Sequence, residues 1–113
     1  MNDEKTAVLA LHQALDTKFA KDILLMDLSE LSPIADYFVI ATGGSTPQLA
    51  ALTEAAEETL KAHGFLLNHT EGIRSGNWVL LDFGTIIVHL FDKESREYYN
   101  LERIWGDARI LTP

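Results

Sequence analysis

A glycine-rich turn, Gly43-Gly44-Ser45, is the first place in this sequence where chemistry could occur. The turn separates a run of strand-forming residues from a helical pattern, and backbone N–H groups at the start of a helix attract anions such as phosphate. The same residues suit a simpler role, in which the glycines make a tight turn and the Ser45 hydroxyl caps the helix. A phosphate site would need further catalytic groups.

The carboxylates that would hold a metal ion beside this turn are not in place. The layout is similar to the entry motif of nucleotidyltransferases, which also need two carboxylates, spaced D-x-D on a later strand, to hold magnesium. Glu57 and Glu58 fall inside the helix, and Asp82 is followed two residues later by Gly84. We therefore expect a nucleotidyltransferase-like fold without its active site, because a fold does not carry function by itself.

Other enzyme and metal motifs are incomplete. Asp82-Phe83-Gly84 spells the magnesium-binding tripeptide of kinases, but no glycine-rich loop, strand lysine or catalytic loop accompanies it. Ser45 lacks the G-x-S-x-G elbow of hydrolases, and the chain contains no cysteine. The histidines show neither the pairing nor the carboxylate spacing of a metal site; they are His12, His63, His69 and His89. We expect no enzyme activity, no cofactor and no metal.

The segment Asn77–Asp92 predicts a β-hairpin, with two runs of strand-forming residues separated at Gly84. Side chains alternate between the two faces of a strand, so Trp78, Leu80 and Asp82 share one face. Both faces of both runs are mostly apolar, which is typical of strands inside a sheet covered by helices.

The remaining sequence alternates helical and extended patterns. Apolar residues at three- and four-residue spacing predict amphipathic helices, and short runs rich in Ile, Leu and Val predict strands. We expect helices over residues 4–20 and 46–63, strands over 22–28, 37–41 and 65–67, a loop over 71–76, and a short helix or turn-rich segment over 93–105. The order predicts an α/β or α+β sandwich, with a mixed β-sheet of about five strands flanked by helices.

Length and composition predict a single domain over residues 1–113, with a core over about 4–105 and a C-terminal tail over 106–113. No segment approaches the roughly 18 apolar residues of a membrane span, and no signal-peptide pattern follows the polar N-terminus. The absence of cysteine fits a reducing compartment. We expect a cytoplasmic protein that makes no membrane contact.

The net charge of −8, from 17 acidic and 9 basic residues, favours a basic partner. Direct nucleic-acid binding as the main contact is disfavoured, because it needs clustered Lys and Arg to displace counterions from phosphates. The charge points to a basic protein without naming it.

Three blocks in the right order, DYFVIATGGS at 36–45, the segment from Trp78 to Phe91, and SREYYNLERIW at 95–105, together resemble the Iojap family of ribosomal silencing factors. The resemblance extends from the first helix to Trp105. It implies a non-enzymatic protein that binds ribosomal protein fourteen of the large subunit, at the face where the small subunit docks. Such binding would block subunit joining and lower translation when nutrients are short.

The contact surface implied by the resemblance surrounds Trp78, Asp82 and Tyr99, which match motif positions of the family. Leu80 joins them by strand alternation alone. A large, rigid ring such as that of Trp78 anchors an interface where it is partly exposed, although a tryptophan here can also cap the core. The predicted partner-binding residues are therefore Trp78, Leu80, Asp82 and Tyr99.

Polar residues near this surface give three more expectations. His89 should be half-buried and hydrogen-bonded to a neighbour, because buried polar groups normally find partners. Arg96 and Glu102 should form an exposed ion pair, or else meet the ribosome. Tyr98 and Tyr99 are adjacent, so only one of them should face the core.

A homodimeric interaction module is an alternative from a different class of protein. If the patch around Trp78 paired with its own copy, the same residues would be explained without a ribosome. Charge separates the two alternatives weakly, because self-association places acidic patches near each other.

Overall fold

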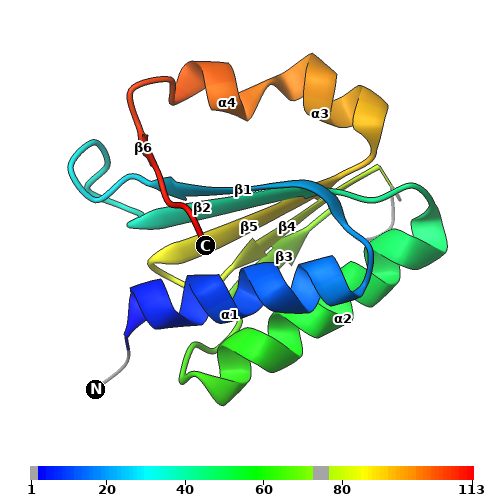
Figure 1. The fold of residues 1–113 in the computed structure, drawn as a ribbon, viewed down its shortest axis with the longest axis horizontal. Helices are drawn as coiled ribbons and strands as arrows, with labels where there is room; N and C mark the ends of the chain where they lie inside the picture. The colour runs from blue at the N-terminus through cyan, green and yellow to red at the C-terminus, as the bar shows by residue number, and fades with distance from the viewer. Residues whose placement is uncertain (1–2, 73–76) are drawn as a thin grey trace.

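The computed structural model describes residues 3–72 and 77–113 and arranges them in three layers (Figure 1). A sheet forms the middle layer, α1 and α2 cover one of its faces, and α3 and α4 lie over the other. The helices are α1 (Glu4–Thr17), α2 (Thr46–Ala62), α3 (Lys93–Tyr99) and α4 (Leu101–Ile104). The strands are β1 (Lys21–Asp27), β2 (Tyr37–Thr42), β3 (His69–Glu71), β4 (Trp78–Asp82), β5 (Ile86–Phe91) and β6 (Arg109–Ile110).

The described strands form one six-stranded sheet in the order β3-β4-β5-β2-β1-β6. β2 and β5 run parallel, and every other neighbouring pair is antiparallel. The predicted hairpin is β4 and β5, whose register places Trp78 opposite Phe91 and Leu80 opposite His89. These pairings confirm the mixed sheet and the α/β class expected from the sequence.

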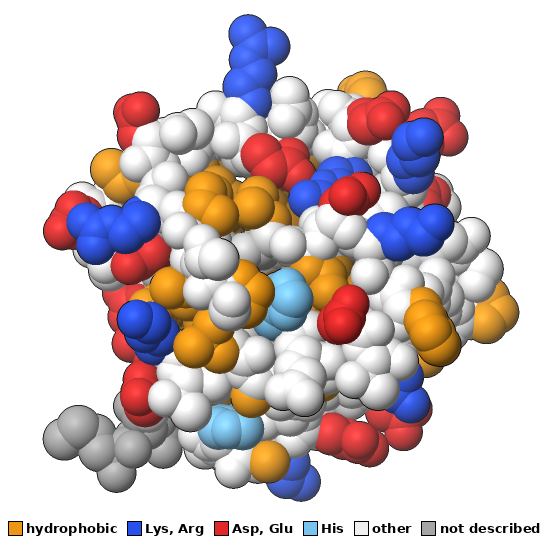
Figure 2. Space-filling model, viewed as in Figure 1, with side chains coloured by type: hydrophobic (Ala, Val, Ile, Leu, Met, Phe, Trp, Pro, Cys, Tyr) orange, Lys and Arg blue, Asp and Glu red, His pale blue; other side chains and the backbone are white. Residues whose placement is uncertain are grey.

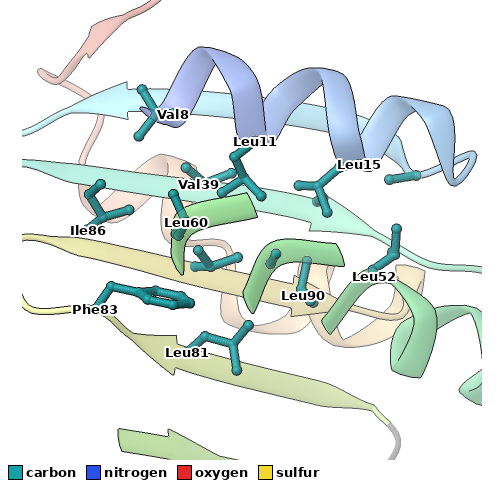
Figure 3. Packing of buried hydrophobic residues seen from close by; sticks show 14 of the residues in the cluster. Val8, Leu11, Leu15, Val39, Leu52, Leu60, Leu81, Phe83, Ile86 and Leu90 are labelled. Carbon is teal, nitrogen blue, oxygen red and sulfur yellow. The ribbon is translucent and has the colours of Figure 1, made fainter. Parts of the chain in front are cut away.

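The main core fills the space between the sheet and the layer of α1 and α2 (Figure 3). Apolar side chains at helical spacing enter it from both helices, among them Leu11 of α1 and Leu52 of α2. β4 contributes Val79 and Leu81, which alternate with the three predicted site residues. Burying one such side chain stabilises the fold by about 1.5–3 kcal/mol, so this packing fixes which face of β4 points inward.

The turn Gly43-Gly44-Ser45 has the simpler of its two predicted roles. Ser45 Oγ accepts a hydrogen bond of 3.2 Å from the backbone N–H of Gln48 and so caps α2. The side-chain amide of Gln48 donates to the carbonyls of Lys18 and Phe19, which joins the start of α2 to the end of α1. A Cβ at Gly43 would lie 2.8 Å from Leu49 Cδ2, so this position has no room for a larger residue.

A second, smaller apolar cluster lies on the other face of the sheet. Its buried members are Met26, Leu28, Ile40 and Phe91, and partly buried side chains including those of Trp78, Leu101 and Trp105 pack against it. Neither α3 nor α4 has a fully buried residue. The two short helices therefore cover this face only in part and leave some of the sheet surface accessible.

The strand predicted over residues 65–67 is wrong, because the strand in this region is β3 at His69–Glu71. After α2 the chain first buries Phe65 in the main core. Pairing begins only where the backbone reaches β4, with the Asn68 N–H donating to the Asp82 carbonyl at 2.8 Å. Of the loop predicted over 71–76, residues 73–76 lie outside the described part of the chain.

The C-terminal part of the chain has two features that the sequence did not predict. The segment 93–105 is helical as expected, but it is divided at Asn100, which has a left-handed backbone with φ of 47°. Residues 109–110, within the segment expected to form a tail, make β6 and pair with β1. The N–H of Leu111 then donates to the Leu25 carbonyl at 2.9 Å, and the Leu111 side chain packs against the main core.

Candidate functional site

The outward face of β4 carries three of the predicted site residues, Trp78, Leu80 and Asp82. All three side chains are half-buried, whereas Val79 and Leu81 between them are buried in the main core. The three residues therefore face the side of the sheet on which α3 and α4 lie. The structure places them together as strand alternation predicts, and their contact with a partner stays a prediction.

Tyr99, the fourth predicted residue, reaches this surface from the end of α3. Its ring centroid lies 5.6 Å from that of Trp78 and 5.9 Å from that of Phe91. Tyr99 is 48% exposed and Tyr98 is 81% exposed, so neither ring enters the core, although one of the two was expected to. The cause is that α3 lies on the surface and has no buried residue. Tyr99 therefore reaches only the edge of the second cluster, and Tyr98 stays outside it.

His89 lies beside the Trp78 ring and is only 5% exposed, more buried than expected. The two rings are nearly parallel, with centroids 6.3 Å apart, and Trp78 Nε1–H donates to His89 Nδ1 at 3.4 Å. Burial lowers the pKa of His89 to about 4, because a charged imidazolium would lose its hydration there. The ring is therefore neutral near pH 7, and it holds the indole in a fixed orientation.

Asp82 has a structural contact in addition to its place on the surface. Its Oδ1 accepts a hydrogen bond of 2.7 Å from the N–H of Gly84, where the hairpin turns with φ of 91°. An aspartate that bonds the backbone two residues on stabilises a tight turn. Asp82 therefore holds the hairpin together and also presents negative charge beside Leu80.

An apolar groove of about 410 Å³ lies next to these residues. One wall is the loop 31–35 between β1 and β2, where Ile34 is 80% exposed. The remaining lining comes from the sheet and the end of α4: Phe38, Leu80, Asp82, Ile87, His89 and Trp105. Sequence reasoning missed the loop as part of the site, although two large apolar residues, Leu31 and Ile34, in a loop between strands were a signal.

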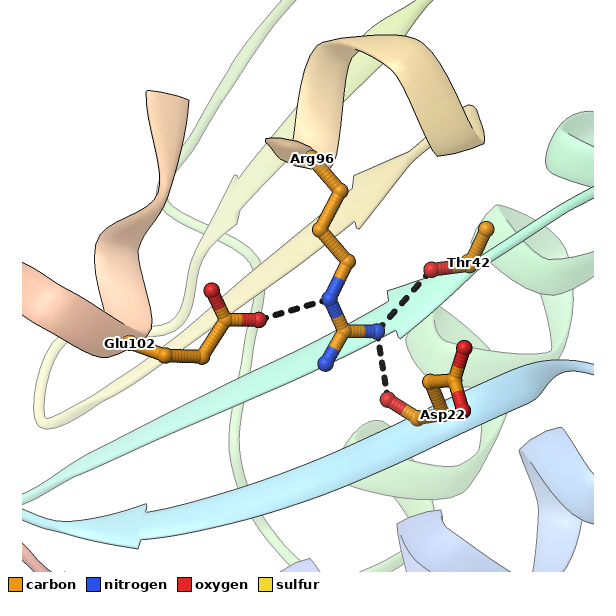
Figure 4. A network of polar contacts seen from close by, with 4 residues as sticks. All are labelled: Asp22, Thr42, Arg96 and Glu102. Carbon is orange, nitrogen blue, oxygen red and sulfur yellow. Dashed lines mark hydrogen bonds and ion pairs between the residues drawn. The ribbon is translucent and has the colours of Figure 1, made fainter. Parts of the chain in front are cut away.

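Arg96 attaches α3 to the sheet, as Figure 4 shows. Its Nε donates to Glu102 Oε1 at 2.6 Å, and its Nη1 donates to Thr42 Oγ1 at 2.9 Å and to the Asp22 carbonyl. The predicted pair with Glu102 therefore forms, but the expectation that it is exposed is wrong, because the two side chains are 14% and 30% exposed. By holding α3 in place, this network positions Tyr99.

Hydrophobic side chains gather between the upper helices, α3 and α4, and α1 in the view of Figure 2, with charged groups around them. Over the whole sequence the acidic residues outnumber the basic ones by 17 to 9. A second cavity, of about 600 Å³, lies beside Arg96 and is lined by groups of both signs, including Lys93 and Glu97. Its mixed lining gives it no preference for a cation or an anion.

Within residues 3–72 and 77–113 no group of three or more His, Asp or Glu side chains could hold a metal ion. In the same described part of the chain, no helix has both the length and the apolar character needed to cross a membrane.

Comparison with known proteins gives a consistent set of similarities. A family model described as "Ribosomal silencing factor during starvation" matches residues 1–112. The ribosomal silencing factor RsfS of Bacillus subtilis is 39% identical over 108 residues, which cover 96% of this chain and 92% of that protein. The chloroplastic protein Iojap of Arabidopsis thaliana is 35% identical over 96 residues, which cover 84% of this chain and 39% of that protein.

The fold has the same kind of match among solved structures. A crystal structure of a protein from Chromobacterium violaceum superposes with a TM-score of 0.86 at 34% sequence identity, covering 92% of this chain and 87% of that one. Another, from Bacillus halodurans, superposes with a TM-score of 0.82 at 28% identity, covering 97% of this chain and all of that one. The same fold thus occurs in experimentally determined structures.

Proposed function

Since the chain belongs to the family of ribosomal silencing factors, we propose that it binds the large ribosomal subunit through ribosomal protein fourteen and keeps the small subunit from joining. The consequence is repression of translation when nutrients are limited. The protein acts by occupying a surface and catalyses no reaction. It works in the cytoplasm, where ribosomal subunits meet.

The observation that carries this proposal is the surface formed by Trp78, Leu80, Asp82 and Tyr99. Two aromatic rings in contact and a leucine give it an apolar centre, and Asp82 adds a carboxylate at its side. Aromatic residues are enriched at the centres of protein interfaces, and a few of them usually supply most of the binding energy. This composition suits a protein partner better than a small molecule.

Charge supports a ribosomal protein as the direct contact. The net charge of −8 would repel the phosphates of ribosomal RNA and attract a basic protein. Complementary charge mainly speeds encounter and sets orientation, while apolar contacts supply affinity. We therefore place the basic partner surface opposite Asp82 and its apolar residues opposite Trp78 and Leu80.

Steric occlusion needs only a rigid body of sufficient size. The described residues extend over 34 × 30 × 25 Å and share a packed core, so the protein is a rigid body of this size rather than an extended chain. A protein of this size on the subunit interface would prevent close approach of the second subunit. No conformational change of the ribosome is required.

Sedimentation through a sucrose gradient tests this proposal. Purified protein is mixed with isolated large subunits, with small subunits, or with joined ribosomes. We expect it to migrate with free large subunits only and to reduce the yield of joined ribosomes when both subunits are supplied. A Trp78→Ala variant should fail on both counts, whereas Glu58→Gln, on the exposed face of α2 and away from this surface, should behave as the wild type.

Two results would contradict the proposal. Absence of binding to large subunits would leave the protein without its assigned partner. A stable homodimer that buries Trp78, detected by sedimentation at several protein concentrations, would assign the surface to a second copy of the chain.

A further inference from the structure

His89 has one ring nitrogen whose bonding the fold leaves incomplete. Nδ1 accepts a hydrogen bond from Trp78 Nε1–H at 3.4 Å, so in the neutral ring the proton must be on Nε2. Nε2 is buried and has no hydrogen-bond partner among the described residues. Buried polar groups in native proteins are almost always paired, and an exception calls for an explanation.

The surroundings of His89 make this arrangement costly for the isolated protein. The ring of Phe38 lies 4.8 Å away and that of Phe91 lies 6.0 Å away, centroid to centroid. Neither ring can replace the water that Nε2–H loses on burial. A phenylalanine at position 89 would have no unpaired donor, so the cost of burying Nε2–H is not explained by apolar packing; in the free protein the polar role of the ring is to accept the Trp78 Nε1–H bond through Nδ1.

The position of His89 suggests where the missing acceptor comes from. His89 is among the residues that line the apolar groove beside Leu80 and Asp82. Most of the lining is apolar, including Ile34, Phe38, Ile87 and Trp105, and Asp82 is its carboxylate. A groove with this lining would accept an apolar side chain, and its polar groups would then decide which segment fits.

We propose that His89 is a specificity-determining residue of this groove and donates its Nε2–H to a main-chain carbonyl of a basic protein segment. That segment places an apolar side chain in the groove and a neighbouring Lys or Arg beside Asp82. The inference rests on the proposed function, because the segment that occupies the groove belongs to the ribosomal protein bound by the surface of Trp78, Leu80, Asp82 and Tyr99. The net charge of −8 and the carboxylate at the groove favour this occupant over a second acidic copy of the chain.

Binding must include a small rearrangement, because Nε2 is covered in the free protein. Side-chain adjustments of this kind are common at interfaces whose backbone hardly moves. The loop that carries the exposed Ile34 forms one wall of the groove and can adjust without disturbing the main core.

Two substitutions separate the binding role from a structural one. His89→Phe keeps an aromatic ring and removes both nitrogen atoms, whereas His89→Gln keeps a donor near the position of Nε2 and an acceptor for Trp78. We expect His89→Phe to bind purified ribosomal protein fourteen about tenfold more weakly, the effect of one hydrogen bond. The melting temperature of each variant is measured beside its affinity, and His89→Gln should bind more tightly than His89→Phe whichever of the two is the more stable.

A direct readout comes from nitrogen-15 NMR of the imidazole in the intact protein. The free protein should show the Nε2–H tautomer, and addition of purified ribosomal protein fourteen should shift the Nε2 resonance as the new bond forms. Equal affinity of His89→Phe and the wild type, or an Nε2 resonance that does not move in the complex, would overturn the inference and leave the proposed function standing. Failure of the wild type to bind large subunits would instead overturn the proposed function and this inference with it.

Discussion

The ring centroids of Trp78 and Tyr99 lie 5.6 Å apart, so the start of β4 and the end of α3 share one continuous surface. The contact joins the two parts of the predicted site that are most distant in sequence. It also means that the position of α3 affects the exposure of Trp78. Both the aromatic residues and the contacts that hold α3 can therefore be tested through binding.

Trp78→Ala should weaken partner binding by about 30-fold or more at a moderate cost in stability. Loss of a central aromatic anchor typically costs about 2 kcal/mol or more, or about a 30-fold loss of affinity. The free energy of unfolding should fall by about 1–2 kcal/mol, because the ring is half-buried and rests on Phe91 and His89. Gradient binding and urea denaturation measure the two effects. A loss of about 3–5 kcal/mol with unchanged binding would instead mark Trp78 as a core residue.

Asp82→Asn tests the electrostatic part of the interface. Asparagine keeps an oxygen for the Gly84 N–H, so the hairpin turn and the melting temperature should be retained. Loss of the charge should weaken binding at low salt and reduce its salt dependence, because ions screen charges over about 10 Å at 0.1 M. Glu58→Gln, on the exposed face of α2, removes the same charge far from the site and serves as the control. Identical salt dependence of Asp82→Asn and the wild type would contradict the prediction.

Local pattern was sufficient to predict the parts of the site that belong to one strand. Alternation along β4 places Trp78, Leu80 and Asp82 on one face, and the burial of Val79 and Leu81 on the other face follows from the same period of two. The cap at Ser45 also follows from residue type and position. These features depend on residues close together in sequence.

The remaining parts of the site depend on contacts between distant segments, which local pattern does not encode. The loop that carries Ile34 borders the groove only because β2 pairs with β5, and β5 brings β4 beside it. Arg96 is partly buried only because α3 folds back over β1 and β2 to reach Thr42 and Asp22. Similarly, the Trp78 and His89 side chains meet across two paired strands, so the sequence predicted a partner for His89 without identifying it.

Arg96→Ala should destabilise the protein and weaken binding without changing any predicted contact residue. Its removal leaves the Glu102 carboxylate and the Thr42 hydroxyl without this donor in a partly buried place. We expect a loss of about 1–3 kcal/mol in the free energy of unfolding. Binding should weaken because α3, which carries Tyr99, is no longer attached to the sheet.

A double-mutant cycle with Glu102→Ala isolates the pair from the rest of the Arg96 network. If the pair matters, the double variant should lose less stability than the sum of the two single variants. Strict additivity in urea denaturation would show that the 2.6 Å contact contributes nothing by itself.

Acid should destabilise the protein through His89. In the unfolded chain an ordinary histidine has a pKa near 6.5, whereas burial lowers the pKa of folded His89 to about 4. The unfolded state therefore binds the proton first as the pH falls, and stability is fully present above pH 6.5 and is lost progressively down to about pH 4. The shift corresponds to about 3 kcal/mol, an upper limit for the loss of stability.

Urea denaturation between pH 7 and pH 4 measures this loss, with His89→Phe as the matched variant. Because that variant has no imidazole at this position, its stability should fall less over the interval, and parallel pH curves for the two proteins would show that His89 does not control acid stability.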